Sequence, residues 1–373
     1  MIDNTVEKST YIDKLSKTLI AIALLALAIY LGKDILIPLA LGTLLAVLLR
    51  PIEAFLIRRG FPKVLAISLA VTTSVLILAG VIFLLSIQFS DFADQLPKLK
   101  KNINDSYRQA RRWIRREYSL SYWQQDQYLK KAQTQTIENL QNSEAIGSIT
   151  GTLGTLVLIP IYAFLLLYYR TMFLHFCIVL FTEKHKPKVL EVLGEIKTII
   201  QSYMVGLLVE TTVVASLNSI GLLVLNVQYA ILLGVMAAIL NLVPYIGGLI
   251  ATVLAILVTF INHPDGFTLF GVIIVFVVVQ FIDNNFLVPY IIGTKVKINA
   301  LVSILGVLIG GALAGFSGMF LSIPAIAILK AVFDRVDHLK AWGILLGDET
   351  PDKTILKLDK ALKDAEKAKL KKG

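Results

Sequence analysis

Long apolar runs, separated by short polar connections, form the main pattern of this 373-residue chain. Residues 64–89 carry no charge, and they exceed the ~20 residues that a helix needs to cross a ~30 Å hydrocarbon core. Further apolar runs lie at residues 146–169, 203–225, 229–243, 246–261, 267–286, 298–315 and 316–333. The pattern predicts an all-α, polytopic membrane protein with about eight spanning helices, together with broken or re-entrant helical hairpins.

The first two apolar runs, residues 18–31 and 35–49, are separated by Gly32, Lys33 and Asp34. A continuous helix over both runs would be about 48 Å long at ~1.5 Å per residue, well beyond the thickness of the hydrocarbon core. We therefore expect a tight helical hairpin at this point.

Two polar stretches flank the uncharged run 64–89. Residues 50–63 contain two prolines and four basic residues, and they predict a basic loop. Residues 91–145 hold ten Lys and Arg against seven Asp and Glu, and apolar residues recur there at helical spacing. We interpret this second stretch as a small insert of amphipathic helices outside the bilayer.

Local signals mark two further points in the chain. Pro160 predicts a kink within the run 146–169, and residues 182–202 read as a polar amphipathic segment that leads to the span 203–225. The resulting organisation has four regions, namely N-terminal membrane helices (1–90), an extramembrane insert (91–145), a membrane region with broken helices (146–333) and a charged tail (334–373).

Composition excludes several classes of protein. Only 17% of the residues are charged and 56% are hydrophobic, whereas soluble proteins carry about 25% charged residues. The single cysteine, Cys177, rules out a disulfide framework and a cysteine-rich metal site within the chain. The histidines stand far apart, no phosphate-binding loop occurs, and no catalytic arrangement stands out, so we expect no enzyme and no metal.

The net charge of +10 predicts an orientation rather than a nucleic-acid partner. Basic residues before the first span, in 50–63, in 170–197 and in the tail fall on one side if each candidate segment crosses. That side should be the cytoplasm, so both termini should be cytoplasmic in a cell (inner) membrane protein with the lipid bilayer as partner. The insert 91–145 then lies outside despite its ten basic residues, near the length at which the rule weakens.

The pentapeptide Leu-Val-Pro-Tyr-Ile occurs twice, at residues 242–246 and 287–291. Asparagine precedes each copy and glycine follows it. Proline and glycine in apolar segments free backbone groups that lipid cannot satisfy, so such breaks lie inside protein or line a cavity. Paired interrupted segments are a pointer to the binding site of a transporter. Two ordinary turns that share a pentapeptide are the alternative.

Polar residues inside apolar runs cluster around these breaks. A carboxylate at membrane depth costs roughly 3 kcal/mol or more, so it should face a cavity, a partner or an ion. We expect Glu210 to couple transport to H⁺ or a cation such as Na⁺, with Asp283 as second choice, although Asp283 also fits an interfacial helix end. The candidate residues of the substrate or ion pathway are Glu210, Asn218, Asn241, Pro244, Tyr245, Gly247, Gly248, Gln280, Asp283, Asn284, Asn285 and Pro289.

A glycine-rich set follows in the last apolar runs. Residues 311–315 match GxxxG, which suits either close helix contact or a re-entrant hairpin. The candidate hairpin and packing residues are Gly310, Gly311, Gly315, Gly318 and Pro324.

Three stretches resemble the AI-2E transporter family, also called the autoinducer-2 exporter or PerM-like family. They are residues 240–248 (LNLVPYIGG), residues 283–289 (DNNFLVP) and residues 310–324, and the similarity extends over most of residues 15–345. The chain departs from the family where many members have proline at Gly248 and His-Pro at Asn299-Ala300. The resemblance implies an oligomeric, pentameric transporter with hairpin-containing mobile elements, associated with autoinducer-2 export or Na⁺/H⁺ exchange.

We therefore expect a transporter or exporter of a small solute, secondary active, with a small molecule or a cation as substrate and no cofactor beyond a coupling H⁺ or Na⁺. An autoinducer-2-like signal and Na⁺/H⁺ antiport are both open. An oligomeric passive channel and a non-transporting membrane scaffold are the alternatives from other classes.

The predicted topology can be tested by cysteine labelling. Ala110→Cys should react with an impermeant reagent from outside, and Ile57→Cys only after permeabilisation, because the two positions lie in opposite connections of the predicted topology. Labelling of both positions from the same side would contradict the orientation.

Overall fold

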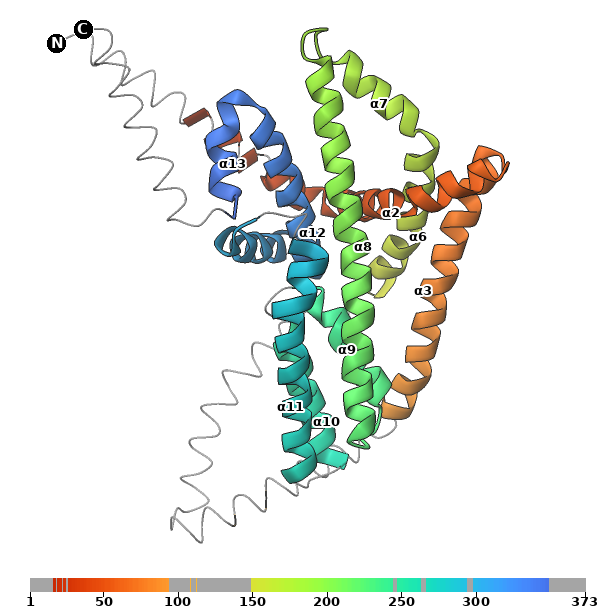
Figure 1. The fold of residues 1–373 in the computed structure, drawn as a ribbon, viewed down its shortest axis with the longest axis vertical. Coiled ribbons are helices and arrows are strands. Elements are labelled where there is room, and N and C mark those ends of the chain that lie inside the picture. Colours follow the sequence, from red (N-terminus) through yellow and green to blue (C-terminus); the bar gives the residue numbers. More distant parts are fainter. Residues whose placement is uncertain are drawn as a thin grey trace, which may run out of the picture. The chain divides into compact units, whose positions relative to one another are not determined.

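The computed structural model describes residues 16–17, 19–21, 23–24, 26–93, 108, 112, 149–243, 247–262, 266–293 and 298–348. These residues are helical apart from short connections (Figure 1). Most of the predicted insert and the tail beyond residue 348 therefore lie outside the described residues.

The predicted fold class, an all-α polytopic membrane protein, is confirmed. Five described helices are long and apolar enough to cross a bilayer, or six if the bent pair α6 (Ile149–Tyr168) and α7 (Arg170–Val179) counts as one span. The five are α2 (Lys33–Arg58), α3 (Lys63–Ala93), α8 (Lys186–Val224), α11 (Gly266–Ile282) with the π-helix η1 (Asp283–Gly293), and α12 (Ala300–Arg335).

The chain divides into two compact units. The first contains residues 1–50, 166–209 and 287–373, and the second contains residues 51–165 and 210–286. Each unit thus combines segments that are far apart in the sequence.

The N-terminal part differs from the sequence prediction in two places. The expected hairpin at Gly32 is wrong, because the N–H of Gly32 donates to Ala28 O at 2.9 Å and its carbonyl accepts from Leu36 N at 2.9 Å, so helical bonding continues across it. The expected loop 50–63 is also too long, since α2 continues through Pro51 to Arg58. Proline removes a single helical N–H, and the residues around Pro51 sustain the helix.

The next apolar run ends in a sharp bend. Helix α6 runs through Pro160, and the chain turns by 63° between α6 and α7. The turning residue is Tyr169, whose φ of −88° and ψ of 6° depart from the helix. Most of the polar segment 182–202 and of the span 203–225 then form one helix, α8, because a helix need not end where its sequence changes from polar to apolar.

In the second unit, α9 (Ala230–Asn241) and α10 (Gly247–Asn262) pack against each other as a helical hairpin. At ~1.5 Å per residue the arms are about 18 and 24 Å long, shorter than the ~30 Å hydrocarbon core. The apolar runs 229–243 and 246–261 therefore form two short arms rather than two complete spans.

The core of the second unit lies where α8, α9, α10 and α11 meet. Four of its buried residues are alanines, which let helix backbones approach closely where lipid gives no hydrophobic driving force. The core residues are Leu222, Val227, Ala230, Leu233, Ala237, Ala251, Ala255, Val258, Val272 and Phe276. A hydrogen bond joins α3 to the first turn of α9, since the side-chain oxygen of Gln88 accepts from Leu232 N at 3.0 Å.

In the first unit, α12 has the length and composition of a span but is itself a helical hairpin. Its helical geometry is interrupted at Ala314 and at Gly315, whose φ of +58° and ψ of −143° suit glycine. A Cβ atom on Gly310 would collide with the carbonyl oxygen of Gly318, and one on Gly318 with that of Gly310. The two arms therefore touch through their backbones, and the glycine-rich set serves a hairpin. Pro324 is buried in its second arm.

Both ends of this hairpin are tied to neighbouring helices. Asn299 donates from its side chain to Leu345 O at 2.7 Å and from its backbone to Leu346 O at 3.1 Å, at the end of α13 (Lys340–Leu346). Arg335 forms ion pairs with Glu191 and Glu195 of α8, at 3.1 and 2.9 Å.

We predict that Gly310→Leu destabilises the protein by about 1–3 kcal/mol, because a large side chain would force the two arms of α12 apart. Thermal unfolding of the detergent-solubilised protein measures the effect. Gly80→Leu is the matched control, since a Cβ atom at Gly80 meets no atom within 4 Å. Equal midpoints for the two variants would refute the backbone contact.

Candidate functional site

The structure brings the two predicted intramembrane acids together. Glu210 lies on α8 and Asp283 begins η1, and both side chains are buried, at 6% and 2% exposure. Their carboxyl groups lie within hydrogen-bonding range of each other. We call these two residues the acid pair.

Close packing of α8 against α11 explains why the acids meet. A Cβ atom on Gly221 would overlap Val275, and one on Gly271 would lie 2.8 Å from the side chain of Leu225. These two glycine contacts let the helices approach and fix an antiparallel register. In this register, Glu210 of α8 lies level with the end of α11, where Asp283 follows.

Two amide side chains, one on α9 and one on α11, donate hydrogen bonds to Asp283. Asn241, the last residue of α9, donates through Nδ2 to Asp283 Oδ2 at 2.8 Å. Gln280, on α11, places Nε2 at 3.5 Å from the same oxygen and at 3.2 Å from Oδ1 of Asn284. The Oδ1 atom of Asp283 and the Oε2 atom of Glu210 accept no hydrogen bond from an amide or hydroxyl donor in the described part of the chain.

The two glycines of the first break have separate steric roles. A Cβ atom on Gly247 would collide with the carbonyl oxygen of Leu240, so Gly247 permits the tight turn between α9 and α10. A Cβ atom on Gly248 would collide with Oε1 of Gln280 and would lie 3.5 Å from Oδ1 of Asn241. Gly248 therefore leaves room for the amides that surround the acid pair.

The described residues of the two pentapeptide copies have different structures. The first lies in the connection between α9 and α10, where Leu242 and Val243 are described and Pro244 and Tyr245 lie outside the described residues. The second lies inside η1, which continues α11 through Pro289 as a π-helix. A helix break at Pro289 is therefore wrong. π-Helical turns are frequent at functional sites, and this one starts at Asp283.

The remaining pathway candidates lie apart from the acid pair. Asn218 is buried on α8, about 12 Å along the helix from Glu210 at ~1.5 Å per residue, and its Oδ1 atom also accepts no hydrogen bond from a donor among the described residues. Asn285 is exposed and donates to Phe281 O of its own helical stretch at 2.9 Å. Sequence analysis missed one buried acid, Glu53 of α2, because it was expected in a loop.

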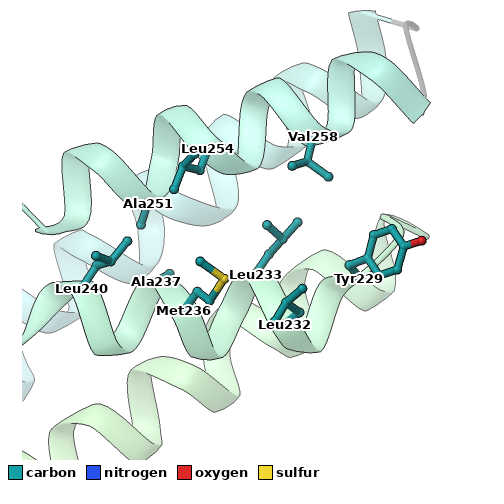
Figure 2. A pocket seen from close by; sticks show the side chains of 9 residues that line it. All are labelled: Tyr229, Leu232, Leu233, Met236, Ala237, Leu240, Ala251, Leu254 and Val258. Carbon is teal, nitrogen blue, oxygen red and sulfur yellow. The ribbon is translucent and has the colours of Figure 1, made fainter. Parts of the chain in front are cut away.

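A small apolar pocket separates the arms of the α9–α10 hairpin. Figure 2 shows that Leu240 and Ala251 line one end of it, while Tyr229 and Val258 line the other, with the Tyr229 hydroxyl pointing away. Its volume of about 60 Å³ is far below the roughly 300–1,000 Å³ of typical ligand sites. We therefore assign it to imperfect packing of the hairpin rather than to solute binding.

We predict that Asn241→Leu destabilises the protein by about 1–3 kcal/mol, because it removes a hydrogen bond from a buried carboxyl group. Asn285→Leu is the matched control, since its amide is exposed and bonds within its own helical stretch. Thermal unfolding in detergent measures both. A loss for Asn241→Leu no larger than that for Asn285→Leu would show that the bond to Asp283 adds nothing.

Comparison with known proteins agrees with this architecture. The sequence pattern of the AI-2E family transporters matches residues 19–337. YueF of Bacillus subtilis (strain 168) is 27% identical over 251 residues, 67% of each chain, and YhhT of Escherichia coli (strain K12) is 24% identical over 336 residues, 89% of this chain and 94% of YhhT. AI-2 transport protein TqsA of Escherichia coli (strain K12) is 25% identical over 324 residues, 84% of this chain and 90% of TqsA. This multi-pass membrane protein therefore belongs to the AI-2E family, a family of transporters and not of enzymes.

Proposed function

We propose that this protein is a secondary active exporter of a small solute, and that the acid pair carries the coupling ion. The observation that supports the proposal most strongly is the contact between two buried carboxyl groups, Glu210 and Asp283. Like charges at this range repel strongly in a medium of low dielectric constant. A proton or a cation shared by the two groups removes the repulsion.

The surroundings of the pair compensate only part of its charge. Both amide donors reach a single oxygen, Asp283 Oδ2. Glu210 receives no comparable donor among the described residues at its Oε2 atom. Uptake and release of one positive charge by the pair is thus a large change in local energy, which is what coupling to an ion gradient requires.

The α9–α10 hairpin connects this charge to a transport pathway. Its arms are too short for a complete span, and the ends where they meet reach the surroundings of the acid pair through Asn241 and Gly248. Irregular backbone at membrane depth is tolerated where it lines a cavity or lies within protein. A solute pathway beside this turn therefore places substrate and coupling ion within one group of helices.

The relatives and the acid pair each support a substrate class. The name of TqsA supports a small polar organic signal such as autoinducer-2, whereas the acid pair also suits Na⁺/H⁺ antiport. We further propose a homo-oligomer in the cell membrane, with both termini in the cytoplasm. The deep burial of the pair favours coupled transport over an open channel, because an open channel would hydrate it.

We predict that Glu210→Gln and Asp283→Asn abolish the dependence of flux on pH or sodium while the protein still inserts in the membrane. Each change keeps the size of the side chain but removes its charge. Flux in proteoliposomes should fall to the level seen without an ion gradient.

Glu183→Gln is the control, because Glu183 is an exposed acid that pairs with Lys186. If both pair variants keep the flux and ion response of the parent, the pair is not the coupling site. Conductance that does not saturate would instead identify a channel.

A further inference from the structure

Gln280 contacts the acid pair and Gly248, in the first turn of α10, at the same time. Its Nε2 faces Asp283 Oδ2 at 3.5 Å, and its Oε1 lies 2.4 Å from the position that a Cβ atom on Gly248 would take. Asn241 has the same two-sided arrangement, with Nδ2 on Asp283 and Oδ1 toward Gly248. Asn241 belongs to the hairpin, however, whereas Gln280 belongs to α11.

We infer that Gln280 is a positioning residue that transmits the charge of the acid pair to the first turn of α10, in the α9–α10 hairpin. This inference rests on the proposed function, because it assumes that the pair gains and loses an ion. It assigns a role in coupling to a side chain that need not touch the solute.

The two amide hydrogen bonds to Asp283 differ in strength. A hydrogen bond to an ionised carboxylate is roughly twice as strong as one to a neutral acceptor. The bond from Gln280 is at the long end of the range, at 3.5 Å, while that from Asn241 is 2.8 Å. When the pair takes up an ion, the Gln280 bond is therefore the first to be lost.

Loss of this bond changes the packing at Gly248. The Gln280 amide then remains held by Asn284, whose Oδ1 lies 3.2 Å from Nε2 on the exposed side of the helix. Turning toward Asn284 withdraws Oε1 from Gly248 and releases the first turn of α10. The hairpin is thus held in one ion state and free to move in the other.

The charged surroundings of Asp283 are simple enough for this mechanism. Among the described residues, the titratable group that faces Asp283 is Glu210 of α8. From the other packed elements, α9 and α11 contribute the amides of Asn241 and Gln280. Helix α10 contributes the backbone at Gly248.

The test measures movement of the hairpin apart from flux. Leu249→Cys places a thiol at an exposed position in the first turn of α10, in a chain whose single native cysteine is replaced by Cys177→Ser. The rate at which a maleimide modifies this thiol in proteoliposomes is measured in two states, with the acid pair loaded with an ion and with it free of ion. Changes in pH and sodium set the two states. We expect the two rates to differ about tenfold in the parent, the change that ~1.4 kcal/mol produces.

In two variants, the ratio of the maleimide rates in the two ion states should be close to one. Gln280→Leu removes the amide, and Gly248→Ala displaces it by adding a Cβ atom that collides with Oε1. If Gln280→Leu fails to fold, Gly248→Ala carries the test. Gln228→Leu, at an exposed glutamine between α8 and α9, and Gly80→Ala should both keep the parent ratio.

The outcomes separate the two claims. Parent flux without any ion dependence would defeat the proposed function and this inference with it. If parent flux depends on the ion, either of two results would overturn the role of Gln280 alone. One is a parent ratio of one, and the other is the parent ratio unchanged in both Gln280→Leu and Gly248→Ala.

Discussion

Repulsion between two buried carboxyl groups is the constraint on which the account of this protein depends. Glu210 and Asp283 approach within hydrogen-bonding range inside a bundle of apolar helices. Like charges so placed are stable only with a proton, a cation or donors between them. The amides of Asn241 and Gln280 supply donors to one oxygen of Asp283, which leaves the pair sensitive to an added positive charge.

Glycine sets the distances that make this constraint possible. Gly221 and Gly271 bring α8 and α11 together, Gly247 permits the turn of the hairpin, and Gly248 makes room for the two amides. In the first unit, Gly310 and Gly318 do the same for the arms of α12. Within a membrane, small residues determine which backbones can touch, and through them which polar groups can meet.

Sequence reasoning identified the components of the site but not their pairing. Glu210, Asn241, Gln280 and Asp283 stand out because polar side chains in apolar runs are expensive, which is a local property of the sequence. Their contact depends on the register between α8 and α11, which only packing determines. Asn218 stands out by the same local rule, yet it lies two turns along α8 from Glu210, so the rule alone could not separate it from the site.

The errors have a common physical origin in the reading of prolines and polar boundaries as breaks. Pro51 lies within α2, since the neighbouring residues maintain the helix around one missing N–H. The first two residues of the repeated pentapeptide lie in a turn in one copy and in a π-helix in the other, so the same dipeptide took different structures in different surroundings. Fold class and the helical runs were predictable because they depend on hydrophobic length alone.

Uphill transport is the most direct measure of the central claim. Proteoliposomes containing the full chain would be given an imposed proton or sodium gradient, with autoinducer-2 and sodium as the transported probes and with Glu210→Gln as the comparison. The account predicts accumulation of one probe against its own gradient, lost when an ionophore dissipates the driving gradient and absent in the variant. Equilibration of every probe down its gradient, with the same rate in both proteins, would contradict it.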